Sequence, residues 1–248
     1  MENIISAKAG FKLKTGQPLT GSISYNGKVF CVVPAFNEEK NINIIIKQIK
    51  PLVDCLVVVD DGSVDQTFKF AQADGVALLK HIINRGQGAA LRTGTQWSLN
   101  HGADIIVHFD ADGQFLSQDI EKIVAPIIAG EAQVVFGSRF LNGSASSAMP
   151  FFKKYFIMPL AKAVNKIFFN VNLTDPQSGF RAMSAEAASR INWQQDRMAH
   201  CSEIMFQVKK HNFKVKEIPI KVIYRSFGQS FSDGLKILKD LFIAMLVN

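Results

Sequence analysis

The sequence predicts an α/β fold in which helices flank a mostly parallel central sheet. Short, continuous apolar runs of strand length alternate with longer amphipathic segments through the first 137 residues. Strands that are apolar on both faces are typical of a parallel sheet covered by helices on both sides. With 248 residues, 48% of them hydrophobic, the chain can bury one sizeable core.

The strands of the first half are marked by short runs rich in β-branched residues, each followed by a polar or turn-forming residue. Pro34 ends the first run, Asp60 follows the second and Asp110 follows the fourth. The predicted strands are Val29–Val33, Cys55–Val59, Val76–Leu79, Ile105–Phe109 and Val134–Gly137. Runs this short favour strands over helices.

Helices are predicted between these strands, where apolar residues recur every three or four positions. Asn37 is suited to open the first helix, and glycines open the third. The predicted helices are Glu38–Ile49, Asp65–Ala73, Gly86–Asn100 and Ile120–Ile128. The alternation places the carboxyl ends of the strands at one edge of the sheet, where such folds bind their ligands.

The second half is less regular. Its expected helices and short strands are Phe151–Phe169, Ala185–Ile191, Ser202–His211, Val215–Pro219, Lys221–Tyr224 and a terminal amphipathic helix at Leu235–Val247. We expect a loose arm at residues 1–28, one α/β domain at 29–231 and a C-terminal amphipathic helix at 232–248. The most apolar segment, Phe151–Phe169, contains four lysines, so we expect no membrane-spanning helix.

Charge is divided unevenly along the chain. Residues 1–138 carry 12 Lys and Arg against 14 Asp and Glu, whereas residues 139–248 carry 16 against 7. An acidic half that holds a metal and a basic half that faces an anion would explain this division, and a solvated basic face is the plain alternative. The three cysteines, Cys31, Cys55 and Cys201, have no metal-ligand spacing and are interpreted as thiols in a reducing cytosol.

Asp110-Ala111-Asp112 is the most informative motif. Two carboxylates one residue apart follow an apolar strand and precede Gly113-Gln114. Mg²⁺ and Mn²⁺ are bound through one or two carboxylates together with substrate phosphate oxygens. The motif therefore predicts a metal that holds a diphosphate-bearing substrate, with a polar turn as the alternative.

Two further motifs follow neighbouring strands. Asp60-Asp61-Gly62-Ser63 offers carboxylates to a base or a ribose, although an Asx-type turn would use the same residues. Asn84-Arg85-Gly86-Gln87-Gly88 opens a helix whose N-terminal amides favour anions. It matches neither a P-loop nor a dinucleotide-binding fingerprint. Arg139, Arg181 and Arg225 lie at loop or strand ends, and arginine is suited to phosphate.

Together these residues resemble the family-2 glycosyltransferases with a GT-A fold, and within them the dolichyl-phosphate mannose synthase and polyprenyl-phosphate glycosyltransferase branch. The matching blocks keep the family's order and cover roughly residues 29–231. They are Val32–Glu39, Val58–Thr67, Asn84–Ala90, Phe109–Gln114, Gly137–Phe140, Asp175 with Gln177–Arg181, and Tyr224–Arg225 with Gly228–Ser230. The Gln-x-x-Arg-Trp motif of processive polysaccharide synthases is absent from the sequence.

The resemblance implies a role for each matching residue. The nucleotide-sugar pocket would be lined by Pro34, Ala35, Asn37, Glu38, Asp60, Asp61, Arg85 and Gln114. Asp110 and Asp112 would hold Mg²⁺ or Mn²⁺ on the donor diphosphate. The acceptor phosphate would be contacted by Arg139, Arg181, Arg225 and Ser178, and Asp175 would belong to the catalytic residues.

The implied reaction moves a sugar from a UDP- or GDP-sugar, with inversion, to a polyprenyl phosphate. A phosphate acceptor is already anionic near neutral pH and needs no general base. The alternative acceptor is a hydroxyl of a growing glycan, which needs one, and Asp175 and Glu203 are the candidates. A non-catalytic nucleotide-sugar-binding protein is a further alternative.

Basic amphipathic segments bear on location and partners. Phe151–Phe169 and the terminal helix combine apolar residues with lysines, a pattern that favours a peripheral position at a membrane surface. Packing on the domain, or a homodimer contact, is the alternative. We expect a cytoplasmic protein at the inner face of the cell membrane. We expect no nucleic-acid partner, because the basic residues form no recognised binding motif.

Overall fold

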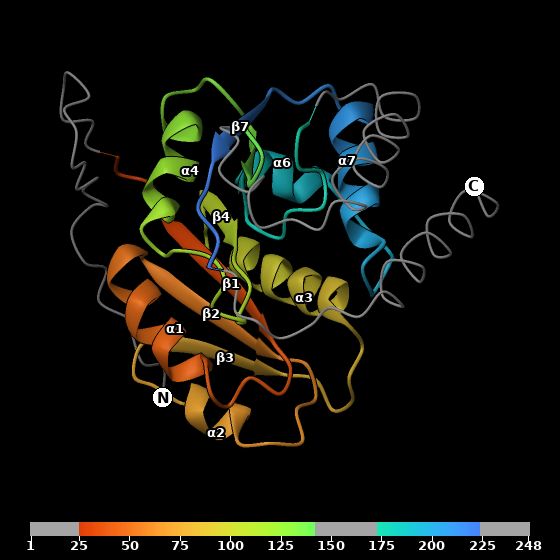
Figure 1. Ribbon diagram of the computed structural model, residues 1–248. Coiled ribbons are helices and arrows are strands. Elements are labelled where there is room, and N and C mark those ends of the chain that lie inside the picture. The colour runs from red at the N-terminus through yellow and green to blue at the C-terminus, as the bar shows by residue number, and fades with distance from the viewer. Residues whose placement is uncertain (1–24, 142–172, 224–248) are drawn as a thin grey trace.

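The computed structural model describes residues 25–141 and 173–223, which form one seven-stranded sheet with helices on both faces (Figure 1). Its strands are β1 (Val29–Ala35), β2 (Cys55–Asp60), β3 (Val76–Lys80), β4 (Ile105–His108), β5 (Val134–Ser138), β6 (Arg181–Ser184) and β7 (Val215–Pro219). Their order is β3-β2-β1-β4-β6-β5-β7. Only β6 pairs antiparallel, with β4 and β5. The expected mostly parallel sheet is confirmed.

Helices cover both faces of the sheet and enclose two apolar cores. They are α1 (Ile42–Ile49), α2 (Thr67–Ala71), α3 (Gln87–Asn100), α4 (Asp119–Ile128), α6 (Ala185–Arg190) and α7 (His200–Lys210), with a 3-10 turn at Lys50–Leu52. One core packs α1 and α4 on the sheet, and the other packs α3, α6 and α7. Because strand side chains alternate between faces, neighbouring residues of β4 belong to different cores.

The α3 helix lies unusually close to the sheet. A Cβ at Gly94 would lie 2.3 Å from Val32 Cγ1 and 3.1 Å from Val59 Cγ2. Glycine is therefore required at this point of α3 for the helix to pack directly on β1 and β2. The close packing fixes the start of α3 relative to the carboxyl ends of these strands.

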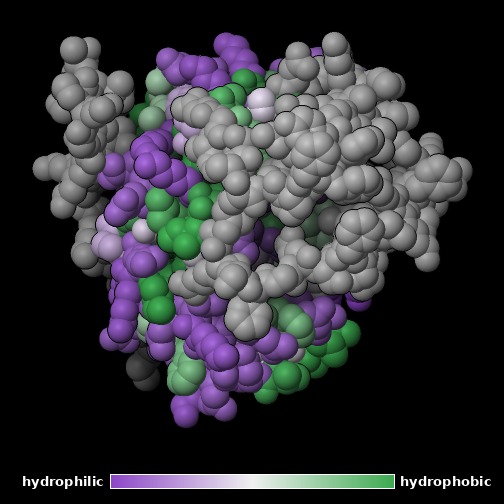
Figure 2. Space-filling view, viewed as in Figure 1, coloured by the Kyte–Doolittle hydropathy of each residue, from purple (hydrophilic) through white to green (hydrophobic). Residues whose placement is uncertain are grey.

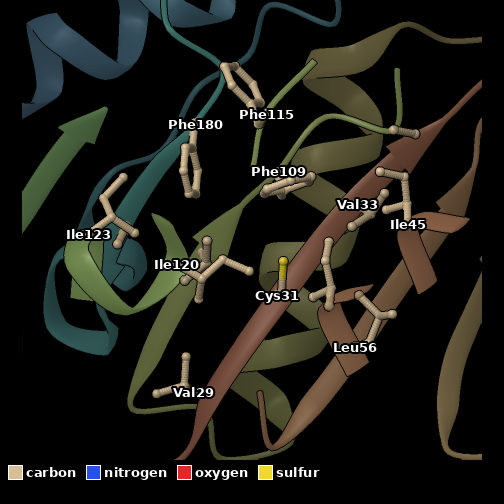
Figure 3. Close-up of a cluster of buried hydrophobic side chains, with 14 of the residues drawn as sticks. Val29, Cys31, Val33, Ile45, Leu56, Phe109, Phe115, Ile120, Ile123 and Phe180 are labelled. Carbon is tan, nitrogen blue, oxygen red and sulfur yellow. The ribbon is translucent and has the colours of Figure 1, made fainter. Parts of the chain in front are cut away.

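Three aromatic rings join the segments that reach the carboxyl edge near β4. Phe109, Phe115 and Phe180 are buried, and their ring centroids lie 5.2–5.8 Å apart (Figure 3). Edge-to-face pairs at such separations add to the stabilisation that burial itself provides. Phe109 immediately precedes Asp110, and Phe180 follows Gly179. The ring cluster therefore anchors both sides of the Asp110 turn.

The structure corrects several expected elements. The sequence analysis missed β6, a four-residue strand that begins with a charged residue and inserts between β4 and β5. Of the expected strand Lys221–Tyr224, the described residues 221–223 contain one antiparallel bridge, between Val222 and Phe115. The first helix begins at Ile42 instead of Glu38, because residues 38–41 form a turn.

Several expectations fall outside the described residues: the arm before residue 25, the helix Phe151–Phe169, Arg225 and the terminal helix. Across the part of the chain that the structure describes, no helix combines the length and apolarity needed to cross a membrane. Hydrophilic side chains dominate the visible described surface, with separate hydrophobic areas (Figure 2). The exposed aliphatic residues include Val64, Ile82 and Ile83.

Candidate active site

The carboxyl ends of β1 and β2 are tied together by hydrogen bonds. The amide of Asp61 donates to the carbonyl of Ala35 at 2.8 Å. The amide of Asn37 donates to Ser63 Oγ at 3.0 Å, and Asn37 Oδ1 accepts from the amide of Val64 at 3.1 Å. Asn37 has a φ of 56°, a left-handed conformation that asparagine tolerates better than most residues. Two predicted pocket segments therefore form one surface.

The predicted nucleotide-pocket residues divide by exposure. Asn37 and Arg85 are exposed, Glu38 and Gln114 are half-buried, and the remaining four are buried: Pro34, Ala35, Asp60 and Asp61. The amide of Glu38 donates to Thr67 Oγ1 at 2.7 Å, which fixes the turn before α1. The buried residues Pro34 and Ala35 contribute backbone and shape to this edge, and not polar side chains.

Asp61 is engaged by protein donors, and its expected part in the nucleotide pocket stays a prediction. It is 2% exposed, and its carboxylate accepts hydrogen bonds from the amides of Arg85 at 3.1 Å and Gly86 at 2.6 Å. His81 Nδ1 lies 2.6 Å from the same carboxylate and His81 Nε2 lies 2.9 Å from Thr93 Oγ1. Three protein donors thus occupy Asp61. Its role in the structure is to anchor the β3–α3 loop.

Asp60 is the carboxylate that is left without partners. Its side chain has no exposed surface, and neither oxygen has a hydrogen-bond partner among the described residues. A buried carboxylate without a partner is costly, so such a group is a candidate to receive a donor from a ligand. The two residues of the pair therefore differ: Asp61 is structurally engaged, and Asp60 is available.

The predicted metal-binding pair, Asp110 and Asp112, lies just after the end of β4. Asp110 Oδ1 accepts a hydrogen bond from Gln87 Nε2 at 2.6 Å, so the first residue of α3 reaches the motif. On the other side, a Cβ at Gly179 would lie 2.3 Å from Asp110 Oδ2. Asp112 Oδ1 accepts from the amide of Gln114 at 2.9 Å, which closes the turn. Asp110 is therefore confined between α3 and the segment before β6.

The electrostatics of the pair suit a divalent cation. Burial, and then the neighbouring charge of Asp112, raise the pKa of Asp110 to about 7, although Arg181 acts in the opposite direction. Two carboxylates held close together repel each other, and a bound cation removes that repulsion. No third His, Cys, Asp or Glu joins them in the described ranges. Two carboxylate ligands, with the remaining positions left to water and phosphate, fit Mg²⁺ or Mn²⁺.

Arg181 lies beneath the site, and its expected contact with the acceptor phosphate stays a prediction. Its side chain has no exposed surface and donates to His200 Nε2 at 3.2 Å and Cys201 Sγ at 3.5 Å. Burial opposes ionisation of Cys201, yet His200 and Arg181 lower the pKa of its thiol to about 6. Burial and then Arg181 hold the pKa of His108 well below its ordinary value. Arg181 is a buried countercharge for this side of the site.

Arg139 and Asp175 form a bidentate ion pair. Arg139 Nε and Nη2 donate to the two carboxylate oxygens of Asp175 at 2.6 and 2.8 Å, and the Arg139 amide donates at 3.1 Å. Asp175 is 1% exposed, and its own amide donates to Glu217 Oε1 at 3.0 Å. A carboxylate engaged on both oxygens is poorly placed to accept a proton from a substrate. In the structure Asp175 orients Arg139, and its expected catalytic role stays a prediction.

Ser178, an expected acceptor contact, and Glu203, a candidate base, also contact protein groups. Ser178 is 1% exposed, and its hydroxyl points to the carbonyl of Phe180 at 3.5 Å. Glu203, the other candidate base, accepts from the amides of Gln194 and Gln195 at 2.8 and 2.7 Å. Glu203 thus holds the loop before α7. Of the proposed acceptor residues within the described chain, Arg139 alone combines charge with partial exposure.

Comparison with known proteins decides the family. The model of the glycosyl transferase family 2 matches residues 30–191, which include the ends of β1, β2 and β4 and both carboxylates of the Asp110 motif. The chain belongs to glycosyltransferase family 2. The expected family is confirmed.

Curated relatives of this family-2 glycosyltransferase align over most of their length. UDP-N-acetylglucosamine–dolichyl-phosphate N-acetylglucosaminyltransferase of Methanococcus voltae is 32% identical over 88% of this chain and 95% of that protein. Polyprenol monophosphomannose synthase of Mycolicibacterium smegmatis is 29% identical over 87% of this chain and 84% of that protein. An uncharacterised protein of Methanocaldococcus jannaschii is 40% identical over 86% of this chain and 90% of its own length.

Solved structures confirm the GT-A fold. Glucosyl-3-phosphoglycerate synthase from Mycobacterium tuberculosis in complex with UDP aligns with a TM-score of 0.65 at 23% identity, over 84% of this chain and 74% of that one. Its complex with Mn²⁺, UDP and glucosyl-3-phosphoglycerate aligns with a TM-score of 0.66 at 23% identity, over 89% and 79%. In that protein, the same fold holds Mn²⁺.

Sequence reasoning missed three residues that shape the site. Gln87 contacts Asp110, Gly179 makes room for it, and His81 holds Asp61. Gln87 and Gly179 belong to motifs that the sequence analysis names. In those motifs, however, only the neighbouring residues Arg85, Ser178 and Arg181 are assigned a part in ligand binding. His81 directly follows β3, just as the predicted site motifs follow other strands. Its position at a strand end could therefore have marked it as a site residue.

Proposed function

We propose that this glycosyltransferase moves a sugar from a UDP- or GDP-sugar to a polyprenyl phosphate, with Mg²⁺ or Mn²⁺ held by Asp110 and Asp112, at a membrane surface. The observation that carries the proposal is the confined Asp110 carboxylate beside Asp112 at the carboxyl edge of a parallel sheet. The names of two aligned relatives, which state dolichyl-phosphate and polyprenol chemistry, support the acceptor class.

The donor would lie across the ends of β1, β2 and β4. When bound, the metal would offset the charge that develops on the leaving diphosphate. Asp60 offers two unpartnered carboxylate oxygens, Asn37 and Glu38 line the neighbouring turn, and Arg85 adds an exposed positive charge. Gln114 follows the proposed metal-binding turn, and its amide donates to Asp112 Oδ1.

The state of Asp175 favours a phosphate acceptor over a sugar hydroxyl. A hydroxyl needs a general base within hydrogen-bond reach. Both candidate bases, Asp175 and Glu203, are engaged by protein donors in the structure. A phosphate needs no base, but it needs a cation, and Asp175 holds the guanidinium of Arg139 in a fixed orientation. Arg225 would add a second cation from outside the described residues.

The donor half of the proposal is tested by thermal unfolding with UDP, GDP and CMP, each with and without Mn²⁺. A ligand at about 100 times its dissociation constant adds roughly 2.7 kcal/mol of stability. We expect a Mn²⁺-dependent stabilisation by UDP or GDP that Asp112→Asn removes. A protein that no nucleotide stabilises would contradict the proposed donor site.

The acceptor half is tested by sugar transfer to polyprenyl phosphate, to the corresponding polyprenol and to an oligosaccharide. We expect product only from the phosphate. Arg139→Ala should raise the KM for that lipid while leaving the nucleotide-dependent stabilisation unchanged. Transfer to the alcohol or the oligosaccharide, but not to the phosphate, would support the hydroxyl acceptor in its place.

A further inference from the structure

Gln87 reaches the metal-binding motif from a different part of the chain. It is the first residue of α3, and its side-chain amide donates to Asp110 Oδ1 at 2.6 Å. A hydrogen bond this short to a carboxylate is of the charge-assisted kind. The opposite oxygen, Oδ2, faces the backbone of Gly179. The two neighbours therefore limit rotation of the carboxylate from both sides.

The backbone of Gln87 is itself held firmly. Gly86 has a φ of 112°, and a Cβ there would lie 2.4 Å from the carbonyl oxygen of Asp196. A Cβ at Gly88 would lie 2.4 Å from the carbonyl oxygen of Gln195. The glycines on both sides of Gln87 thus let the start of α3 pack directly on the backbone of the segment before α7.

Hydrogen bonds lock the same contact. The amide of Ala89 donates to the carbonyl of Asp196 at 3.1 Å, and Trp193 Nε1 donates to the carbonyl of Gly88 at 2.9 Å. Arg92 donates to the carbonyls of Trp193 and Gln194 at 3.1 and 3.2 Å. A side chain on so well fixed a backbone can aim a hydrogen bond with little loss of entropy on ligand binding.

We propose that Gln87 is a positioning residue that orients the Asp110 carboxylate for the divalent cation. The inference rests on the proposed function, because it assigns the cation to Asp110 and Asp112. Gln87 does not need to bind the cation itself. Its N–H occupies one lone pair of Oδ1 and leaves the other lone pair of that oxygen for the cation.

Two effects of the hydrogen bond oppose each other. The N–H withdraws some negative charge from Oδ1, which weakens its attraction for a cation. The same bond holds the carboxylate in place before the cation arrives. Loss of a hydrogen bond that orients a metal ligand typically costs about tenfold to a hundredfold in metal affinity, so we expect orientation to prevail.

The test is Mn²⁺ binding in the presence of UDP, followed by electron paramagnetic resonance of the free ion. Gln87→Leu removes the donor at similar size, and Gln87→Asn keeps the amide but shortens its reach. We expect both to weaken Mn²⁺ binding at least about tenfold. The matched control is Gln96→Leu on the same helix, since Gln96 is exposed and its side-chain amide donates to Asn100 Oδ1. This variant should leave Mn²⁺ binding unchanged.

Unfolding in the presence of a chelator separates folding from positioning. If either Gln87 variant keeps its unfolding midpoint and loses Mn²⁺ affinity, the inference is supported. Unchanged or tighter Mn²⁺ binding in both variants would overturn it. Asp112→Asn distinguishes this failure from failure of the proposed function. If Asp112→Asn also binds Mn²⁺ normally, the metal site itself is elsewhere.

Discussion

Gly179 has no room for a side chain, because the carboxylate of Asp110 occupies the space where a Cβ would lie. A methyl group there would be 2.3 Å from Oδ2 and 2.8 Å from both Cγ and Oδ1. Ordinary contact with carbon begins near 3.5 Å, so Gly179→Ala would force the carboxylate to retreat by about 1 Å.

The displacement should affect stability and metal binding to different degrees. Overpacking of a well-packed site costs about 1–3 kcal/mol of unfolding free energy. A displacement of about 1 Å at a reacting or ligating group can cost on the order of a hundredfold in function. We therefore expect Gly179→Ala to fold and to lose about a hundredfold in Mn²⁺ affinity.

Urea unfolding in a chelator and Mn²⁺ titration with UDP measure the two effects. Asp110→Ala provides the matched background, because removing the carboxylate removes the clash. Gly179→Ala should then cost little additional stability, and the difference between backgrounds is the coupling energy of the pair. An equal stability loss in both backgrounds, or undiminished Mn²⁺ affinity in Gly179→Ala, would refute the reasoning.

Two further predictions concern the carboxylates. Burial and Asp112 raise the pKa of Asp110 to about 7, so the metal-free folded state holds this proton more tightly than the unfolded chain does. The stability that comes from this proton is present below about pH 4 and is lost as the pH rises through about 7. Urea unfolding midpoints measured in a chelator should therefore fall over this pH range, and Asp110→Asn should make the midpoint less dependent on pH. Asp61→Asn should lower the unfolding free energy by about 1–3 kcal/mol, because it replaces one acceptor oxygen by an NH₂ group and leaves at least one of the donors from His81, Arg85 and Gly86 unsatisfied. An unchanged urea midpoint would show that Asp61 does not anchor the loop.

The parallel strands and the edge that carries the site could be predicted from the sequence. Apolar runs such as Val29–Val33 and Ile105–Phe109 are too uniformly hydrophobic for anything but buried strands, and their observed bounds differ by at most two residues. Because parallel strands end at a common edge, the polar residues that follow them had to converge. The local sequence is therefore enough to predict the parallel sheet and to place Asp110 and Asp112 at its carboxyl edge.

The sequence could not show that β6 inserts antiparallel between β4 and β5. Arg181 begins that strand, and its four residues, Arg-Ala-Met-Ser, include no β-branched or aromatic residue that would signal a strand. Its burial depends on α7, from which His200 and Cys201 pack against it. An arginine at a strand end is therefore expected at the surface until the packing of a distant helix is known.

By itself, the sequence determined the fold class and the family and predicted Asp110 and Asp112 as metal ligands, since these depend on periodicity and on residues close together in the chain. Only the tertiary structure decided what each polar side chain touches. Gln87 and Gly179 lie 92 residues apart in the sequence, yet they confine the same carboxylate. Asp60 and Asp61 are adjacent, yet one is unpartnered and the other accepts three donors. Hydrogen bonds and steric contacts act over a few ångströms in space, so their partners are fixed only when distant segments meet.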